Sequence, residues 1–179
     1  MNGQAPSPNK FRVPVQGNSM SPLIEATDTI IAESLTFHEL RRGAVIVFRD
    51  GDNLIVHRII RKKVKDGHGL FCQMGDNSSA YSWVGEKDVL GEVLSIAKRR
   101  KVIPLEGPLA LSVGLGIRLI GLAFIGSDAF LNRVQNNLCD ERTGLVLQDI
   151  RKLTAAAHHM ACRSLSMIFL WARRKSDHP

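Results

Sequence analysis

The chain has 179 residues, 44% of them hydrophobic and 23% charged, with a formal net charge of +7. This hydrophobic content excludes a wholly disordered chain, and the length suits one domain with an appendage. The cysteines are odd in number and widely spaced, which excludes a disulfide framework and suits a reducing compartment. They are Cys72, Cys139 and Cys162.

Charge divides the chain near residue 97. Residues 1–97 hold 11 Lys/Arg and 11 Asp/Glu, whereas residues 98–179 hold 13 against 6. We therefore expect a flexible N-terminal segment at 1–10, a folded domain at 11–97 and a basic, mostly helical region at 98–179. Residues 1–16 are polar, contain proline and lack an apolar core, so we expect neither a signal peptide nor an N-terminal anchor.

The first distinctive segment is residues 17–24, with the sequence GNSMSPLI. Ser19 within it is a candidate nucleophile, although a serine in a polar turn is usually an ordinary loop residue. Gly17 permits a turn that brings the backbone close to a bound peptide, and Pro22 limits any helix that starts here. A serine hydroxyl needs a neighbouring base to attack a carbonyl, so the interpretation depends on finding one.

Short runs rich in β-branched residues predict strands in the first half. The predicted strands are Thr29–Ala32, Ala44–Phe48, Leu54–Ile60, Leu70–Met74 and Val89–Ile96. Residues 50–53, with the sequence DGDN, predict a hairpin turn between two of them. We expect a mainly β fold, a twisted antiparallel sheet or partly open barrel, followed by a helical, apolar and basic appendage.

His57 lies 38 positions after Ser19, in the middle of a predicted strand. Its imidazole titrates near physiological pH and could accept the serine proton, although a histidine in an apolar strand is often only a core residue. A substrate peptide could lie along such a sheet as an added strand. Asp76 follows in a Gly-Asp-Asn turn, where its carboxylate could either orient His57 or cap backbone N–H groups.

Six motifs in order resemble the signal-peptidase superfamily, which also includes the self-cleaving SOS repressors. They lie at residues 17–24, 28–30, 43–48, 56–58, 75–77 and 89–93. The resemblance covers about residues 11–97, and His57 stands where the archaeal and endoplasmic-reticulum branch has histidine and the bacterial branch has lysine. It implies a serine endopeptidase of the signal-peptidase type that requires no metal or cofactor.

The resemblance also implies the roles of individual residues. Ser19 would be the nucleophile, with its own backbone N–H as an oxyanion donor, and His57 the general base. Gly17, Asn18 and Met20 would lie beside the oxyanion and the substrate.

Two positions depart from the family pattern. Gly17 replaces a serine that can supply an oxyanion donor in bacterial enzymes, which leaves Asn18 as a substitute. Ser82 stands where the histidine branch has a catalytic aspartate, so Asp76 is the nearest carboxylate for His57 unless the site is a dyad. These departures keep open a catalytically inactive module that binds an extended peptide.

A second alternative is a DNA-associated regulator similar to the SOS repressors, which would use the basic second half. No helix-turn-helix pattern precedes Ser19 in this sequence, and His57 replaces the lysine of those proteins. The expected partner is therefore a peptide or precursor protein and not a nucleic acid. No pattern specifies the oligomeric state.

Residues 108–126 are mostly apolar, and Arg118 is their one charged residue. The segment is long enough to cross a bilayer, but a central arginine costs about 2.5–3.5 kcal/mol on insertion scales. It could span a membrane, lie on an anionic membrane surface, or dock on the domain or a partner. The basic residues just before it predict a catalytic domain that faces the cytoplasm, free or membrane-associated.

Residues 145–175 predict a long helix. Its expected apolar face comprises Leu147, Ile150, Leu153, Ala157 or His158, Ala161, Leu165 and Ile168. His158, His159 and Cys162 have the spacing of one helical turn, but no fourth candidate ligand lies near them, so we expect no zinc site.

Overall fold

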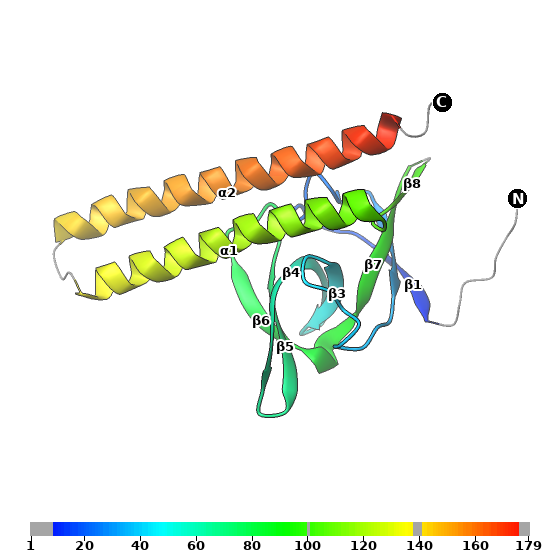
Figure 1. Cartoon of the computed structure of the whole chain (residues 1–179), viewed down its shortest axis with the longest axis horizontal. Coiled ribbons are helices and arrows are strands. Elements are labelled where there is room, and N and C mark those ends of the chain that lie inside the picture. Colours follow the sequence, from blue (N-terminus) through cyan, green and yellow to red (C-terminus); the bar gives the residue numbers. More distant parts are fainter. Residues whose placement is uncertain (1–8, 100, 138–140, 176–179) are drawn as a thin grey trace, which may run out of the picture.

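The computed structural model describes residues 9–99, 101–137 and 141–175. A curled β-sheet forms the first part, and two long helices form the second (Figure 1). The strands are β1 (Lys10–Pro14), β2 (Thr29–Glu33), β3 (Val45–Asp50), β4 (Asn53–Lys65), β5 (His68–Met74), β6 (Tyr81–Gly85), β7 (Val89–Lys98) and β8 (Lys101–Pro104). The helices are the short η1 (Glu86–Asp88), then α1 (Pro108–Asn137) and α2 (Glu141–Lys175). The predicted mainly β fold with a helical appendage is confirmed.

Two of the predictions fall mostly on residues outside the described ranges. These are the flexible segment at 1–10, apart from Asn9 and Lys10, and the third cysteine, Cys139. The other two cysteines, Cys72 and Cys162, are free and buried.

The sheet is antiparallel, with the strand order β1-β2-β7-β3-β4-β5-β6 and β8 beside β7. β3 and β4 form the predicted hairpin, in which Asp50 pairs with Asn53 and Gly51 adopts a φ of 57°. This left-handed conformation costs glycine little, which explains the residue at the turn. The hairpin places His57 in register with Ile46, in the middle of the sheet.

The sheet is covered on both faces. Ile46 and Val47 are adjacent on β3, so their side chains point to opposite faces, yet both are fully buried. Ile46 packs in a cluster with Phe71, whereas Val47 packs in another cluster that includes Phe169 of α2. α2 therefore contributes to the core of the β domain.

α1 docks closely on the β domain through two glycines. A Cβ added at Gly114 would lie 2.9 Å from the carbonyl oxygen of Gly43, and one added at Gly121 would lie 2.9 Å from Met74. Arg118 donates from Nε to the carbonyl oxygen of Ile60 (3.0 Å). α1 is long and apolar enough to cross a membrane by length and composition; one side of it packs against protein, and 28% of its apolar window is buried.

The predicted apolar face of α2 is partly wrong. Leu147 and His158 are buried as expected, but Ile150, Leu153 and Ile168 are exposed. The buried side continues through Cys162, Ser166 and Phe169. The apolar residues of α2 lie on two sides of the helix, so the sequence pattern did not distinguish the side that contacts the protein.

Candidate active site

Ser19 and His57 meet in the structure. Ser19 follows β1 in a turn, and its Oγ lies 3.0 Å from Nε2 of His57 on β4. Both side chains are half-buried. The distance is within hydrogen-bond reach for a nucleophile and its base, so the geometry permits proton transfer from the serine hydroxyl to the imidazole.

Gln73 orients the imidazole from the other side. Nδ1 of His57 hydrogen-bonds Oε1 of Gln73, and Nε2 of Gln73 donates to Oγ of Ser82 (2.5 Å). Because an amide oxygen only accepts, Nδ1 carries the imidazole proton and Nε2 is left with a lone pair. This is the tautomer that can accept the proton of Ser19.

The Gln73–Ser82 contact follows from the strand register. Gln73 on β5 and Ser82 on β6 are directly paired across the two strands. Gln73 is a buried polar residue within the strand sequence HGLFCQM. A buried amide needs hydrogen-bond partners, so a glutamine inside an apolar strand was the sequence signal that could have indicated this role.

Burial lowers the pKa of His57 below its ordinary value, opposed by the Gln73 hydrogen bond and by the negative charge of Asp76. A lowered pKa keeps the imidazole neutral near pH 7. A neutral imidazole can accept a proton, so the environment suits a general base.

The role of Gln73 predicts a pH effect. Gln73→Glu places a carboxylate at Nδ1 of His57 and should move the pH midpoint of Ser19 reactivity upward by about one unit. Gln73→Leu leaves the tautomer unfixed and should slow the reaction roughly tenfold or more. Labelling rates with a serine-directed electrophile across pH would measure both. Gln135→Glu, at an exposed position of α1, matches the charge change and should leave the profile unmoved.

The Gly-Asp-Asn turn holds the nucleophile segment. A Cβ added at Gly75 would lie 2.5 Å from the carbonyl oxygen of Ser19 and 3.0 Å from Nε2 of His57, so no larger residue fits without displacement. Asn77 donates from its backbone N–H to the carbonyl oxygen of Ser19 (2.7 Å) and from Nδ2 to that of Asn18 (3.2 Å). The turn thus fixes Ser19 beside His57.

Asp76, considered from the sequence as the carboxylate nearest to His57, is paired with Arg58 instead. Its Oδ1 accepts from Nε of Arg58 (2.8 Å) and its Oδ2 from Nη2 (2.6 Å), and both side chains are buried. Burial disfavours the charge on Arg58, but the carboxylate outweighs it and raises the pKa of the guanidinium. Gln73, not Asp76, makes the hydrogen bond to Nδ1 of His57.

The three residues expected beside the oxyanion lie in different surroundings. Gly17 is exposed, has a φ of 139°, and would leave an added Cβ in open space. Asn18 is exposed, and its carbonyl oxygen also accepts from the backbone N–H of Ser21 (3.0 Å). Met20 is buried, and its sulfur accepts from the backbone N–H of Asp76 (3.4 Å), so its side chain packs under the site.

A groove of about 300 Å³ runs past Ser19 and His57. Residues 13–17, around the end of β1, line one wall, and residues 54–57 of β4 line the other. Apart from His57, Ser19 and Gln16, its walls are apolar or glycine. An extended peptide could lie between these two backbone segments with its carbonyl group facing Ser19.

Of the three residues weighed and set aside as zinc ligands, His158 and Cys162 are buried, with Sγ 3.8 Å from each ring nitrogen, and His159 is half-buried. No group of three or more His, Cys, Asp and Glu side chains within the described ranges is arranged to hold a metal ion.

Comparison with known proteins connects this geometry to a family. A model of the Peptidase S24-like family matches residues 3–71, which include Ser19 and His57. The match supports the assignment of this part of the chain to the S24-like superfamily of serine peptidases and related repressors. No curated protein and no solved structure matches significantly.

Proposed function

We propose that the protein is a serine endopeptidase of the signal-peptidase type that cleaves a peptide or precursor protein. The proposal rests on one observation: beside the groove, Ser19 contacts His57, and His57 in turn hydrogen-bonds Gln73. Its histidine base favours the archaeal and endoplasmic-reticulum type within the superfamily.

The proposed reaction has two stages. Oγ of Ser19 attacks the peptide carbonyl carbon while Nε2 of His57 takes the hydroxyl proton, and the backbone N–H of Ser19 donates to the oxyanion. The C–N bond then breaks as His57 returns the proton to the leaving amine. A water molecule, deprotonated by His57, hydrolyses the acyl-enzyme and regenerates Ser19.

A serine-directed electrophile tests the proposal directly. We expect intact mass to rise by one adduct in the wild type, with the adduct on Ser19, and to stay unchanged in Ser19→Ala. Ser112→Ala, which removes an exposed serine from α1, should label as the wild type does. A folded wild type without any adduct would contradict the proposal.

The alternative is a module that binds an extended peptide without cleaving it. It is favoured by one specific observation, the neutral Gln73 at the position where a carboxylate would stabilise a protonated His57. This module would bind peptide in the groove with equal affinity in the wild type and Ser19→Ala, and would form no adduct.

A further inference from the structure

Both long helices carry exposed apolar side chains on the sides that are not packed against protein, and these side chains together are here termed the outer face. Its large side chains are all exposed by 38% or more. On α1 they are Leu115, Leu119 and Phe130. On α2 they are Val146, Ile150, Leu153, Met160, Met167, Ile168 and Trp171.

Packing accounts for one side of each helix. On α1, Gly114 and Gly121 face the β domain, and Gly116 faces Leu165 of α2. On α2, the buried side contacts α1 and the β domain, as shown by the Phe124–His158 ring contact at 4.9 Å and by Phe169 in the sheet core. The apolar stripes that remain exposed on the two antiparallel helices make up the outer face.

The spacing of the α2 stripe makes it continuous along the helix. From residue 146 its members recur at alternating steps of four and three, as Val146, Ile150, Leu153, Ala157, Met160, Ser164, Met167 and Trp171. Steps of this kind stay on one side of a helix. Soluble monomers rarely expose apolar patches beyond a few hundred Å², so a surface of this length indicates a binding partner.

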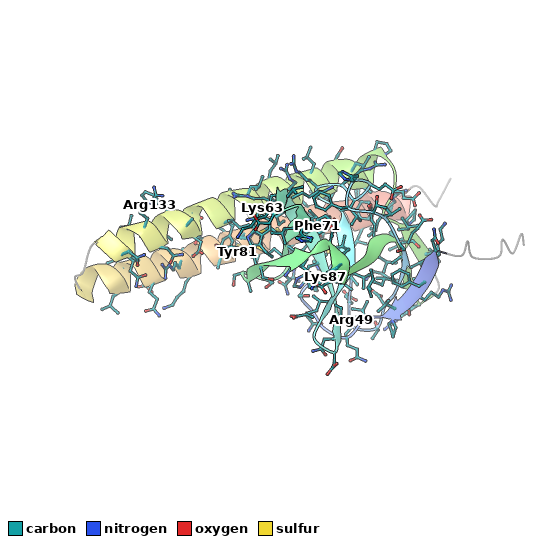
Figure 2. All side chains as sticks on the ribbon, turned by 90° about the horizontal axis from the view of Figure 1, so that it is seen from below. Arg49, Lys63, Phe71, Tyr81, Lys87 and Arg133 are labelled. Carbon is teal, nitrogen blue, oxygen red and sulfur yellow. The ribbon has the colours of Figure 1, made fainter. Side chains whose placement is uncertain are left out.

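The charges in the sequence of the two helices are mainly basic. Residues 108–175 include nine Lys/Arg and four Asp/Glu. The two acidic side chains described on these helices have basic neighbours, since Asp128 lies 4.0 Å from Arg151 and Asp149 lies 3.1 Å from Lys152. Arg163 and Arg133 are exposed, and Arg133 lies where the helices project beyond the β domain (Figure 2).

An aromatic residue and basic residues meet at the other end of the helices. Trp171 is 58% exposed and lines a surface hollow together with three basic residues, Lys98, Arg99 and Lys101, and two acidic ones, Glu25 and Asp28. Tryptophan and basic side chains favour the headgroup region of a bilayer, where the ring is half-immersed and the cations contact lipid phosphate. The composition of the outer face is that of a helix lying in such an interface.

We propose that the outer face lies flat on an anionic lipid bilayer, with the β domain held on the aqueous side by the contacts of α1. Neither helix needs to cross the bilayer, because α1 keeps its contacts with the sheet and Arg118 keeps its hydrogen bond to Ile60. The proposal does not depend on peptidase activity.

Vesicle sedimentation tests the proposal. The full-length wild type should sediment with vesicles of equal parts phosphatidylcholine and phosphatidylglycerol, and about tenfold more weakly with phosphatidylcholine alone. In a Trp83→Phe background Trp171 is the single tryptophan, and its fluorescence should shift to shorter wavelength on addition of the anionic vesicles. A wild type that stays in the supernatant would overturn the proposal.

Matched variants separate the outer face from other exposed apolar residues. Leu119→Asp combined with Leu153→Asp changes side chains that are 55% and 70% exposed, so the fold should persist while vesicle binding falls about tenfold or more. Val64→Asp changes a residue 61% exposed at the β4–β5 end of the sheet and should bind as the wild type does. Equal losses in both variants would contradict the assignment to the outer face.

A second copy of the chain is the competing occupant. If the outer face joined two copies, light scattering would give twice the monomer mass, the Leu119→Asp/Leu153→Asp variant would become monomeric, and vesicles would not bind. That combination would overturn the lipid proposal. A monomer that binds anionic vesicles would support it.

Discussion

Replacing His57 with alanine should slow the reaction of Ser19 with a serine-directed electrophile by about 10²–10⁴-fold, the usual contribution of a positioned general base. Nε2 of His57 lies 3.0 Å from Oγ of Ser19, so its removal leaves the hydroxyl proton without an acceptor at that position. The measurement is the labelling rate followed by intact mass. The control variant is His68→Ala, which changes the exposed first residue of β5 and should label at the wild-type rate.

The pH profile gives an independent check on the same residue. Because burial lowers the pKa of His57, the imidazole stays neutral as pH falls through the ordinary histidine range. The wild-type labelling rate should therefore fall only below about pH 6.5, which is the pKa of an unperturbed histidine side chain. A His57→Ala variant that labels at the wild-type rate, or a wild-type midpoint above that value, would rule out His57 as the base.

Motif order allowed the nucleophile and base to be paired from sequence, because the segments of Ser19 and His57 are weak signals alone but stand in order with four other motifs. Gly17 and Pro22 mark the turn, and a β-branched run marks the strand. The five predicted strands all exist, but β1, β6 and β8 were missed. β1 and β6 are the two ends of the strand order and β8 pairs only with β7, so these short strands lie at the margins of the sheet.

The partner of the imidazole could not be predicted because it depends on strand register. Arg58 follows His57 directly, so the two side chains point to opposite faces of β4, and Asp76 reaches the face occupied by Arg58. Gln73 reaches the His57 face across β4 and β5, whose register shifts between Ile59 and Arg61. Neither the shift nor the resulting choice of partner has a local signature.

The Arg58–Asp76 pair predicts the largest effect on stability. Arg58→Met should lower the free energy of unfolding by about 3–5 kcal/mol, because it leaves the carboxylate of Asp76 buried without its ion partner. The variant also loses the hydrogen bond from Nη1 of Arg58 to the carbonyl oxygen of Gly43 (2.7 Å). Urea unfolding would measure the change, and Arg61→Met, at an exposed position of the same strand, should stay within about 0.5 kcal/mol of the wild type.

A double variant distinguishes the unpaired charge from lost packing. Arg58→Met with Asp76→Leu removes both ions, so it should be more stable than Arg58→Met alone even though it changes one more buried residue. The double variant should label more slowly than the wild type, because Asp76 lies between Gly75 and Asn77, whose contacts position Ser19. A double variant less stable than Arg58→Met would show that packing, and not the unpaired charge, accounts for the loss. The pair therefore couples the stability of the fold to the geometry of the nucleophile through one three-residue turn.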